Sequence, residues 1–172
     1  MTSLFELPPI ALSVRQPWAW AICRADKDIE NRSAAAVRHG MTPRRIAIHA
    51  AKGMTRCEYE DARDFMASIG VECPRPDALV RGAIIGAVTV TAIVAEHTSP
   101  WFFGPRGLVL EKPLTLGTPR PAVGQLGYFA WTESGAVDEP KPWMKSWPDD
   151  TKRSASPDGE LPEPAPLLDL MR

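Results

Sequence analysis

Residues 10–19 read IALSVRQPWA, and this short stretch sets the start of the fold. Its first half, Ile10 to Val14, is an apolar run of the length and type expected for a short strand. Pro17 suits the first turn of a helix, where no backbone N–H is needed, and that helix should run to about Ala25. The sequence therefore predicts a strand that leads almost directly into a helix.

The remainder of residues 1–131 indicates more strands and one further helix. Strands are expected at residues 45–50, 83–94, 108–110 and 128–131, which are rich in β-branched or aromatic residues. A helix is expected from Thr55 to about Ile69, because Thr55 and Glu58 have the spacing of a capping box and Gly70 can end the helix. We therefore predict an α+β fold, a small mixed β-barrel with two to three flanking helices.

The composition changes near Trp131. Residues 132–172 hold seven of the 18 prolines, and nine acidic against five basic residues give them a balance of −4. Such a segment buries too little apolar surface to offset chain ordering, so we predict an acidic, Pro-rich C-terminal tail after a domain at residues 1–131. Trp143 and Trp147 are the exception. We expect the piece that holds them to dock on the domain.

Length and cysteine content restrict the class of protein. The 172 residues suit one domain. Its three cysteines, Cys23, Cys57 and Cys73, form no Cys-x-x-Cys pair, and neither they nor the histidines have metal-ligand spacing, so we predict no metal and no cofactor. The longest weakly charged apolar run, residues 82–95, is too short for a bilayer. We expect a reducing, cytoplasmic environment and no membrane partner.

The first third of the chain is basic, and it contains a compact charged motif. Residues 1–56 hold nine lysines and arginines against four acidic residues, a balance of +5 that can attract a polyanion or can simply be solvated. Lys27 and Arg32 can hold a phosphate, while Glu30 can accept a hydrogen bond from a base edge or a water. Otherwise they form a surface ion pair of little energetic value.

Five further polar or aromatic residues are candidates for ligand contacts. Trp18 can stack on an unpaired base. Ser13 and Gln16 can offer neutral hydrogen bonds to a base or phosphate, or can cap the nearby helix. His49, at a strand end, can contact a base or be structural, and Lys52 can contact a phosphate or be solvated. These residues complete the predicted ligand site.

A second aromatic cluster lies at Trp101, Phe102 and Phe103, after a proline. Three large apolar residues on a loop can form a lid over a cleft or a plug at the barrel end. Glu96 and His97 precede this cluster, and they can face Lys27 across the mouth of the barrel.

Three stretches in chain order, residues 12–19, 27–32 and 48–50, together resemble the signature of the ASCH family (activating signal cointegrator homology). The signature looks like Ser-x-x-Gln-Pro-Trp-Ala, then Gly-x-Lys-x-x-Glu-x-Arg, then a strand ending in Ile-His-Ala. The matching residues are Ser13, Gln16, Pro17, Trp18, Ala19, Lys27, Glu30, Arg32, His49 and Ala50. Ala25 stands where the family usually has Gly, so either a turn with positive φ is absent or the helix is longer.

The resemblance covers roughly residues 10–131, and it implies a PUA-like barrel that binds nucleic acid. We therefore expect an RNA-binding protein that holds an unpaired or modified base or nucleotide in a basic, aromatic cleft; DNA or a free nucleotide is an open alternative. Some relatives look like ribonucleases, for which Lys27 and Glu30 would be the catalytic pair of a metal-independent hydrolase. Others look like acetylcytidine amidohydrolases with a Lys-x-x-Thr motif, but Glu30 replaces that Thr here.

A third interpretation is an adaptor that binds a protein partner through residues 132–172. Deletion of those residues would separate this function from nucleic-acid binding.

Overall fold

The computed structural model describes residues 6–149 of the chain. Its secondary-structure elements, in chain order, are β1 (Ile10–Val14), α1 (Trp18–Arg24), β2 (Ile29–Arg32), α2 (Ala34–Arg38), β3 (Arg44–Ala50), α3 (Arg56–Ser68), the 3-10 helix η1 (Pro76–Ala78), β4 (Ala83–Val94), β5 (Arg106–Pro121), β6 (Tyr128–Ala130) and α4 (Pro142–Lys145). The predicted mixed α+β fold is confirmed.

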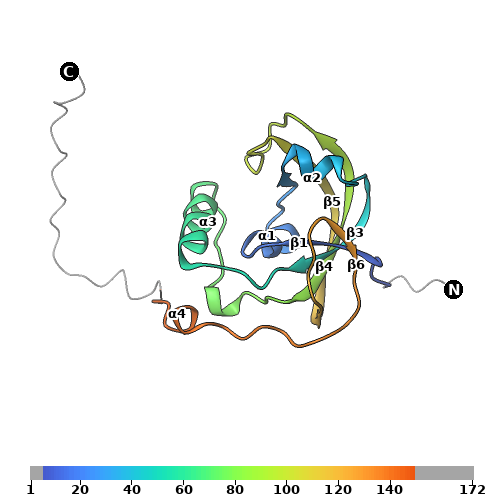
Figure 1. Ribbon diagram of the computed structural model, residues 1–172. Helices are drawn as coiled ribbons and strands as arrows, with labels where there is room; N and C mark the ends of the chain where they lie inside the picture. Colours follow the sequence, from blue (N-terminus) through green and yellow to red (C-terminus); the bar gives the residue numbers. More distant parts are fainter. Residues whose placement is uncertain (1–5, 150–172) are drawn as a thin grey trace, which may run out of the picture.

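The strands form one six-stranded sheet in the order β2-β5-β4-β3-β1-β6. The pair β1 and β3 is parallel, and the other neighbours are antiparallel. The sheet curls into a half-barrel, and α1 lies between it and α3 (Figure 1). This curvature brings β1 and β2, which are not neighbours in the sheet, close enough for a side-chain contact between them.

The alternation of side chains along β1 explains the position of the core. Leu12 and Val14 point into the main apolar cluster with Ile22 of α1, while Ala11 points to the opposite face and packs near Phe129 of β6. Ser13 shares the face of Ala11, because successive strand residues point to opposite sides. The strand therefore presents one polar side chain away from the main core.

The structure differs from the sequence prediction in its helices. It has four α-helices among residues 6–149 rather than two to three, because α2 and α4 are short segments of five and four residues without a long apolar face. The longest, α3, has thirteen residues, begins after the capping box of Thr55 and Glu58, and ends at Ser68. Within the described residues, no helix combines the length and the apolar character needed to cross a membrane.

Two further differences concern β5 and the end of α1. β5 spans residues 106–121 rather than 108–110, because its backbone keeps pairing with β4 through several register shifts, while most side chains after Leu110 are exposed and give no apolar pattern. The helix α1 is not extended by Ala25, which caps it with φ −131°. Asp26, the next residue, has a positive φ of 52°, so a turn with positive φ is present and neither of the two expected consequences of Ala25 occurs.

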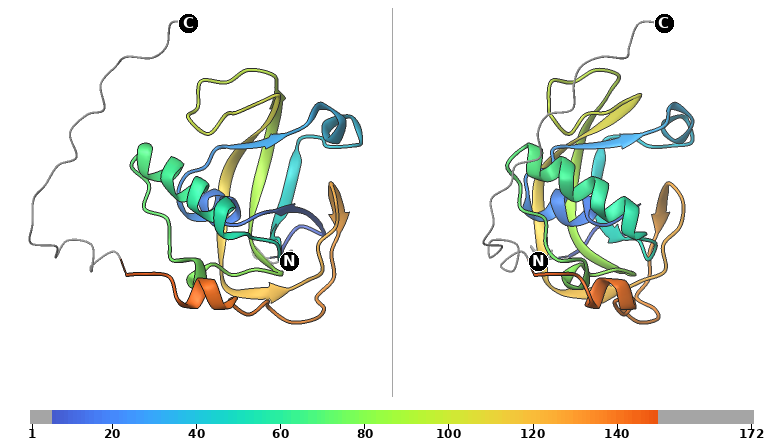
Figure 2. Two further views of the ribbon diagram at one scale, coloured as in Figure 1. Left: turned by 60° about the vertical axis from the view of Figure 1, so that its left-hand side comes forward. Right: turned by 90° about the vertical axis from the view of Figure 1, so that its left-hand side faces the viewer.

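The segment after β6 returns to the domain. Met144 of α4 is fully buried, and Trp147 lies with its ring centroid 4.8 Å from that of Tyr59 in α3. Figure 2 shows α4 beside η1, on the side of the molecule opposite α2. The predicted tail at 132–172 falls only in part on this segment, since residues 150–172 lie outside the described residues.

Candidate functional site

Lys27, Glu30 and Arg32 form a chain of charges that is largely shielded from solvent. Lys27 Nζ lies 2.7 Å from Glu30 Oε2 and also donates to the carbonyl of Ile29. Arg32 Nη2 lies 3.1 Å from Glu30 Oε1. The side chains of Lys27, Glu30 and Arg32 are 2%, 10% and 20% exposed, so this group is not a solvated surface pair. Two cations share one carboxylate, which leaves a positive charge in excess.

Local structure explains why these three side chains meet. Lys27 lies between the end of α1 and the start of β2, where its backbone N–H donates to Ala21. Glu30 and Arg32 are two residues apart on β2, so they share a face of the strand. The pairing of β2 with β5 places Glu30 opposite Leu108 of the main apolar cluster, so this face points toward that cluster, while Ile29 is buried on the opposite face.

A pocket of about 230 Å³ lies directly against these charges and is lined by Trp18, Lys27, Glu30, Asn31 and Phe103. The ring centroids of Trp18 and Phe103 are 6.4 Å apart, and Lys27 Nζ lies 6.0 Å from the centroid of Trp18. Pockets for drug-sized ligands are typically about 300–1,000 Å³. The volume of this pocket therefore suits one planar ring system rather than a larger ligand.

Asn31, which the sequence analysis did not select, holds the aromatic loop in place. Its Nδ2 donates to the carbonyl of Trp101 at 2.8 Å, and its Oδ1 accepts from the backbone N–H groups of Phe103 at 2.8 Å and Gly104 at 3.2 Å. Trp101 is buried, whereas Phe103 is 59% exposed and borders the pocket. One loop thus supplies both a plug and a partial lid. The partners of Asn31 are about 70 residues away in the sequence. Its position inside the charged motif was therefore the only sequence signal that could have identified it as a site residue.

Arg32 connects the charged group to β1. Its Nη2 donates to the carbonyl of Ser13 at 2.8 Å, across the gap between β2 and β1. Its Nε is buried and donates to no acceptor within residues 6–149. A buried donor without an acceptor costs about 1–3 kcal/mol. The guanidinium therefore has an unused donor that is shielded from solvent and lies behind Glu30 rather than in the pocket lining.

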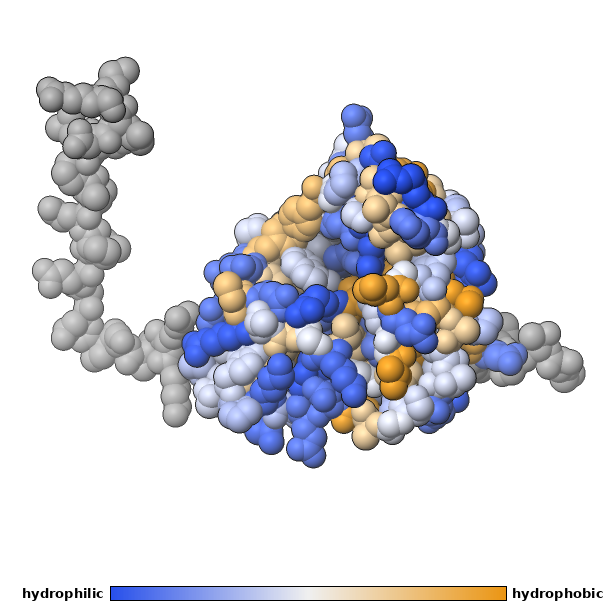
Figure 3. All heavy atoms as spheres, viewed as in Figure 1, coloured by the Kyte–Doolittle hydropathy of each residue, from blue (hydrophilic) through white to orange (hydrophobic). Residues whose placement is uncertain are grey.

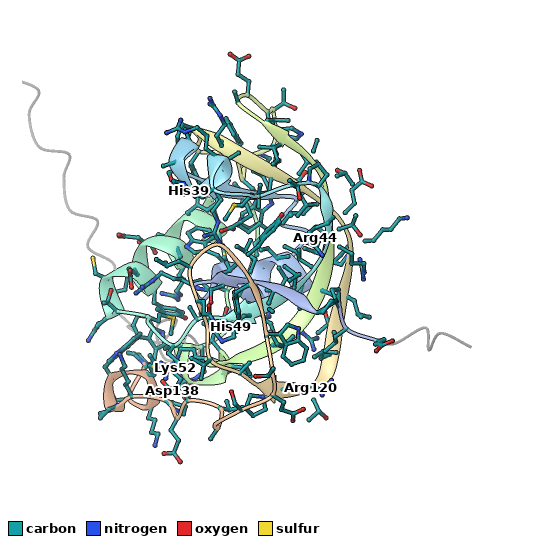
Figure 4. All side chains as sticks on the ribbon, turned by 45° about the vertical axis from the view of Figure 1, so that its right-hand side comes forward. His39, Arg44, His49, Lys52, Arg120 and Asp138 are labelled. Carbon is teal, nitrogen blue, oxygen red and sulfur yellow. The ribbon has the colours of Figure 1, made fainter. Side chains whose placement is uncertain are left out.

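Ser13 and His49 form a second polar group, which adjoins the contact between Arg32 and the carbonyl of Ser13. Ser13 Oγ lies 2.6 Å from His49 Nδ1, and His49 Nε2 lies 2.9 Å from the carbonyl of Ala122. Burial lowers the pKa of His49 below its ordinary value, an effect that the nearby charge of Lys52 reinforces and the hydrogen bond to Ala122 opposes. Figure 4 shows His49 framed by the arc of chain around β6.

Four other selected residues lie apart from the pocket. Gln16 is buried and serves the backbone, since its Nε2 donates to Val80 and its Oε1 accepts from the N–H of Trp20. Lys52 is exposed and packs beside Gly82. Glu96 and His97 are exposed and are not among the residues that line the pocket. The structure thus brings Trp18, Lys27, Glu30 and Arg32 together, with Ser13 and His49 adjoining them.

Within residues 6–149, no three His, Cys, Asp or Glu side chains are grouped so that they could hold a metal ion. Comparison with protein-family models gives no match, and comparison with curated proteins gives none either. The function is therefore inferred from the geometry and chemistry of the site.

Proposed function

We propose that this protein binds nucleic acid and holds an unpaired or modified base in the pocket that Trp18 and Phe103 border, with RNA preferred to DNA. One observation carries the proposal. Two aromatic rings border a pocket of about 230 Å³ whose wall contains Lys27 and Glu30, and Arg32, which pairs with Glu30 outside the pocket lining, gives the group its excess positive charge. Flat rings recognise the face of a base, and buried cations recognise oxygen atoms of phosphate or base carbonyl groups.

The two kinds of contact supply different parts of the affinity. Stacking of a base on an aromatic side chain is worth about 1–3 kcal/mol and tolerates any base. Lys27 is fixed by Glu30 and by the Ile29 carbonyl, so it presents its charge to a ligand in a defined orientation. Arg32 adds positive charge from behind Glu30. A ligand with both a flat ring and an oxygen acceptor therefore fits better than a simple anion.

The resemblance to the ASCH family supports the same proposal. The residues of the resemblance that border the pocket, Trp18, Lys27 and Glu30, come from two of its three stretches, and Arg32 joins them through Glu30. The curled sheet with flanking helices is compatible with the barrel that a PUA-like protein would have. We include membership of this superfamily in the proposal.

Hydrolysis by Lys27 and Glu30 is the alternative, and the geometry supports it less. Each oxygen of Glu30 already lies within 3.1 Å of a cationic nitrogen. Both oxygens are thus engaged with cations, so neither is held free for proton transfer with a substrate. We therefore assign these residues to binding and orientation of the ligand.

The experiment measures binding of fluorescently labelled single-stranded RNA and DNA oligonucleotides to the full-length protein over a series of salt concentrations, with and without EDTA. We expect the affinity for RNA to fall with salt, with a logarithmic slope of about −0.7 for each phosphate neutralised. We also expect no cleavage. Failure to bind either oligonucleotide at low salt would overturn the proposal, and cleavage that persists in EDTA would replace it with the metal-independent hydrolase.

A further inference from the structure

Ser13 and His49 have an arrangement that base binding does not require. They are direct partners on the parallel strands β1 and β3, on the sheet face opposite the main core. The Ser13 Oγ to His49 Nδ1 distance is 2.6 Å, which is short for a neutral hydrogen bond. A hydroxyl bonded to an imidazole that a third group orients is the arrangement of an activated nucleophile.

The surroundings of His49 determine which nitrogen can accept a proton. The carbonyl of Ala122 can only accept, so His49 Nε2 carries the hydrogen of their 2.9 Å bond. In the neutral ring, Nδ1 then has a free lone pair, and the hydroxyl of Ser13 donates to it. Burial also lowers the pKa of His49, against the opposing hydrogen bond to Ala122 and with the nearby charge of Lys52, so the ring is neutral at pH 7 and Nδ1 is free to accept a proton.

Ser13 is the more exposed member of the pair. It is half-buried, while His49 behind it is only 2% exposed. A Cβ at position 124 would lie 2.5 Å from both Ser13 Oγ and His49 Cε1, so the main chain of Gly124 packs directly against this pair and only glycine fits at the position. The Arg32 guanidinium, which donates to the carbonyl of Ser13, brings a positive charge to the same place.

The loop between β5 and β6 suggests the chemical nature of the substrate. Val123 is 60% exposed and Leu126 is 99% exposed, although both are apolar. Figure 3 shows hydrophobic side chains near the centre of the face where Figure 1 places this loop. An uncharged substrate with a short apolar acyl group can contact these side chains and extend its carbonyl carbon toward Ser13.

We propose that Ser13 and His49 form a catalytic dyad that hydrolyses small carboxylic esters. Ser13 Oγ forms a bond to the ester carbonyl carbon while its proton moves to His49 Nδ1. The bond from that carbon to the alkoxy oxygen then breaks, and the departing alcohol takes the proton from Nδ1. Water attacks the acyl-Ser13 ester, gives one proton to Nδ1, and releases the carboxylic acid as the proton returns to Ser13 Oγ. Atoms balance with one water consumed, and no redox partner is needed.

Covalent labelling of the full-length protein tests the dyad directly. A fluorophosphonate probe should add to the wild type at one site, located by peptide mass spectrometry at Ser13, and p-nitrophenyl acetate should be hydrolysed. Ser13→Ala removes only the hydroxyl and should abolish labelling, and His49→Gln should slow labelling by at least tenfold. Ser68→Ala, an exposed serine of α3, is the matched control and should label as the wild type does.

Gly124→Ala keeps the test valid if a His49 variant fails to fold. The added methyl group would lie 2.5 Å from both side chains, so it should displace Ser13 or His49, break their hydrogen bond and slow labelling in a folded protein. Labelling should also weaken as the pH falls, because protonated His49 cannot accept the hydroxyl proton. Absence of labelling in the folded wild type, or labelling that survives Ser13→Ala, would overturn the proposal. Neither result bears on RNA binding, which is measured separately and does not depend on Ser13 Oγ.

Discussion

Arg81 and Lys27 are both buried cations, and their surroundings differ in a way that separates a structural from a functional charge. The Arg81 side chain is 1% exposed, donates to the carbonyls of Lys52 and Glu139, and lies 2.6 Å from the carboxylate of Asp138. Arg81 thus connects the segment after β3 to the segment after β6. Its positive charge is balanced by a single carboxylate, that of Asp138. Lys27 shares its carboxylate with a second cation and borders a pocket.

The difference teaches that burial of a charge does not by itself indicate function. Both cations are more buried than most surface charges, and each has an acidic partner within 2.7 Å. Only the Lys27 group combines excess positive charge, a cavity and, in Arg32 Nε, a donor without an acceptor among residues 6–149. The comparison therefore predicts that changes at Arg81 affect folding and changes at Lys27 affect binding.

The largest effect should come from Arg81→Met. Loss of the guanidinium leaves two carbonyls and the partly exposed Asp138 carboxylate without their donor. Since each hydrogen bond to a charged group is worth about 1.5–3 kcal/mol, the free energy of unfolding should fall by at least that amount. Urea unfolding followed by fluorescence measures the loss. Arg120→Met is the control, because Arg120 pairs with the exposed Glu133 and should change stability by no more than about 1 kcal/mol. Equal effects at Arg81 and Arg120 would contradict the structural role of Arg81.

Lys27→Met should mainly affect binding. A hydrogen bond to a charged group is worth about 1.5–3 kcal/mol, so the affinity for single-stranded RNA should fall about ten- to hundredfold. Stability should fall less than in Arg81→Met, since Glu30 retains its bond to Arg32. Titration of labelled RNA measures the affinity, with Lys52→Met as an exposed control. A large loss of stability with unchanged affinity would make Lys27 equivalent to Arg81.

Phe103→Ala should reduce RNA affinity with little change in folding. The ring is 59% exposed, so its removal costs little core packing, while loss of one stacked base costs about 1–3 kcal/mol of binding. Leu126→Ala is the matched control, since Leu126 is also exposed and lies outside the pocket. The same RNA titration compares the two variants. If Leu126→Ala weakens binding as much as Phe103→Ala does, the pocket is not the place where the base stacks.

The smallest expected effect is a pH dependence of stability that comes from His49. Its pKa is lowered on folding, chiefly by burial, so the unfolded chain binds the proton more readily. This stabilisation is complete above the unfolded pKa of about 6.5 and is lost as the pH falls from there toward the folded pKa. Urea unfolding at several pH values should show the wild type approaching His49→Gln in stability as the pH falls. A constant difference would contradict the assigned shift.

Local sequence signals predicted those parts of the fold that depend on neighbouring residues. The Thr55–Glu58 capping box placed the start of α3, and the β-branched run placed β4 at its observed bounds. The charged motif also identified Lys27, Glu30 and Arg32 as neighbours, because a strand puts alternate residues on one face. Each of these inferences uses contacts over a few residues only.

Contacts between distant parts of the chain could not be read from the sequence. Asn31 meets the loop at Trp101, Arg32 meets Ser13, and Arg81 meets Asp138 only after the sheet curls and the segment beyond β6 returns. Gln16 is a residue type that often contacts ligands, yet in the fold its side-chain amide donates to the carbonyl of Val80. Register and strand order decide such contacts, and a single sequence does not specify them.

The central claim is that the Trp18–Phe103 pocket holds a base while the buried cations contact oxygen atoms of the ligand. The most direct measurement compares the affinity of the wild type and of Phe103→Ala for an RNA octamer and for the same ribose-phosphate chain without bases. We predict that the wild type prefers the octamer at least fivefold and that Phe103→Ala loses most of this preference while it still binds the abasic chain. Equal wild-type affinity for both ligands would contradict the claim.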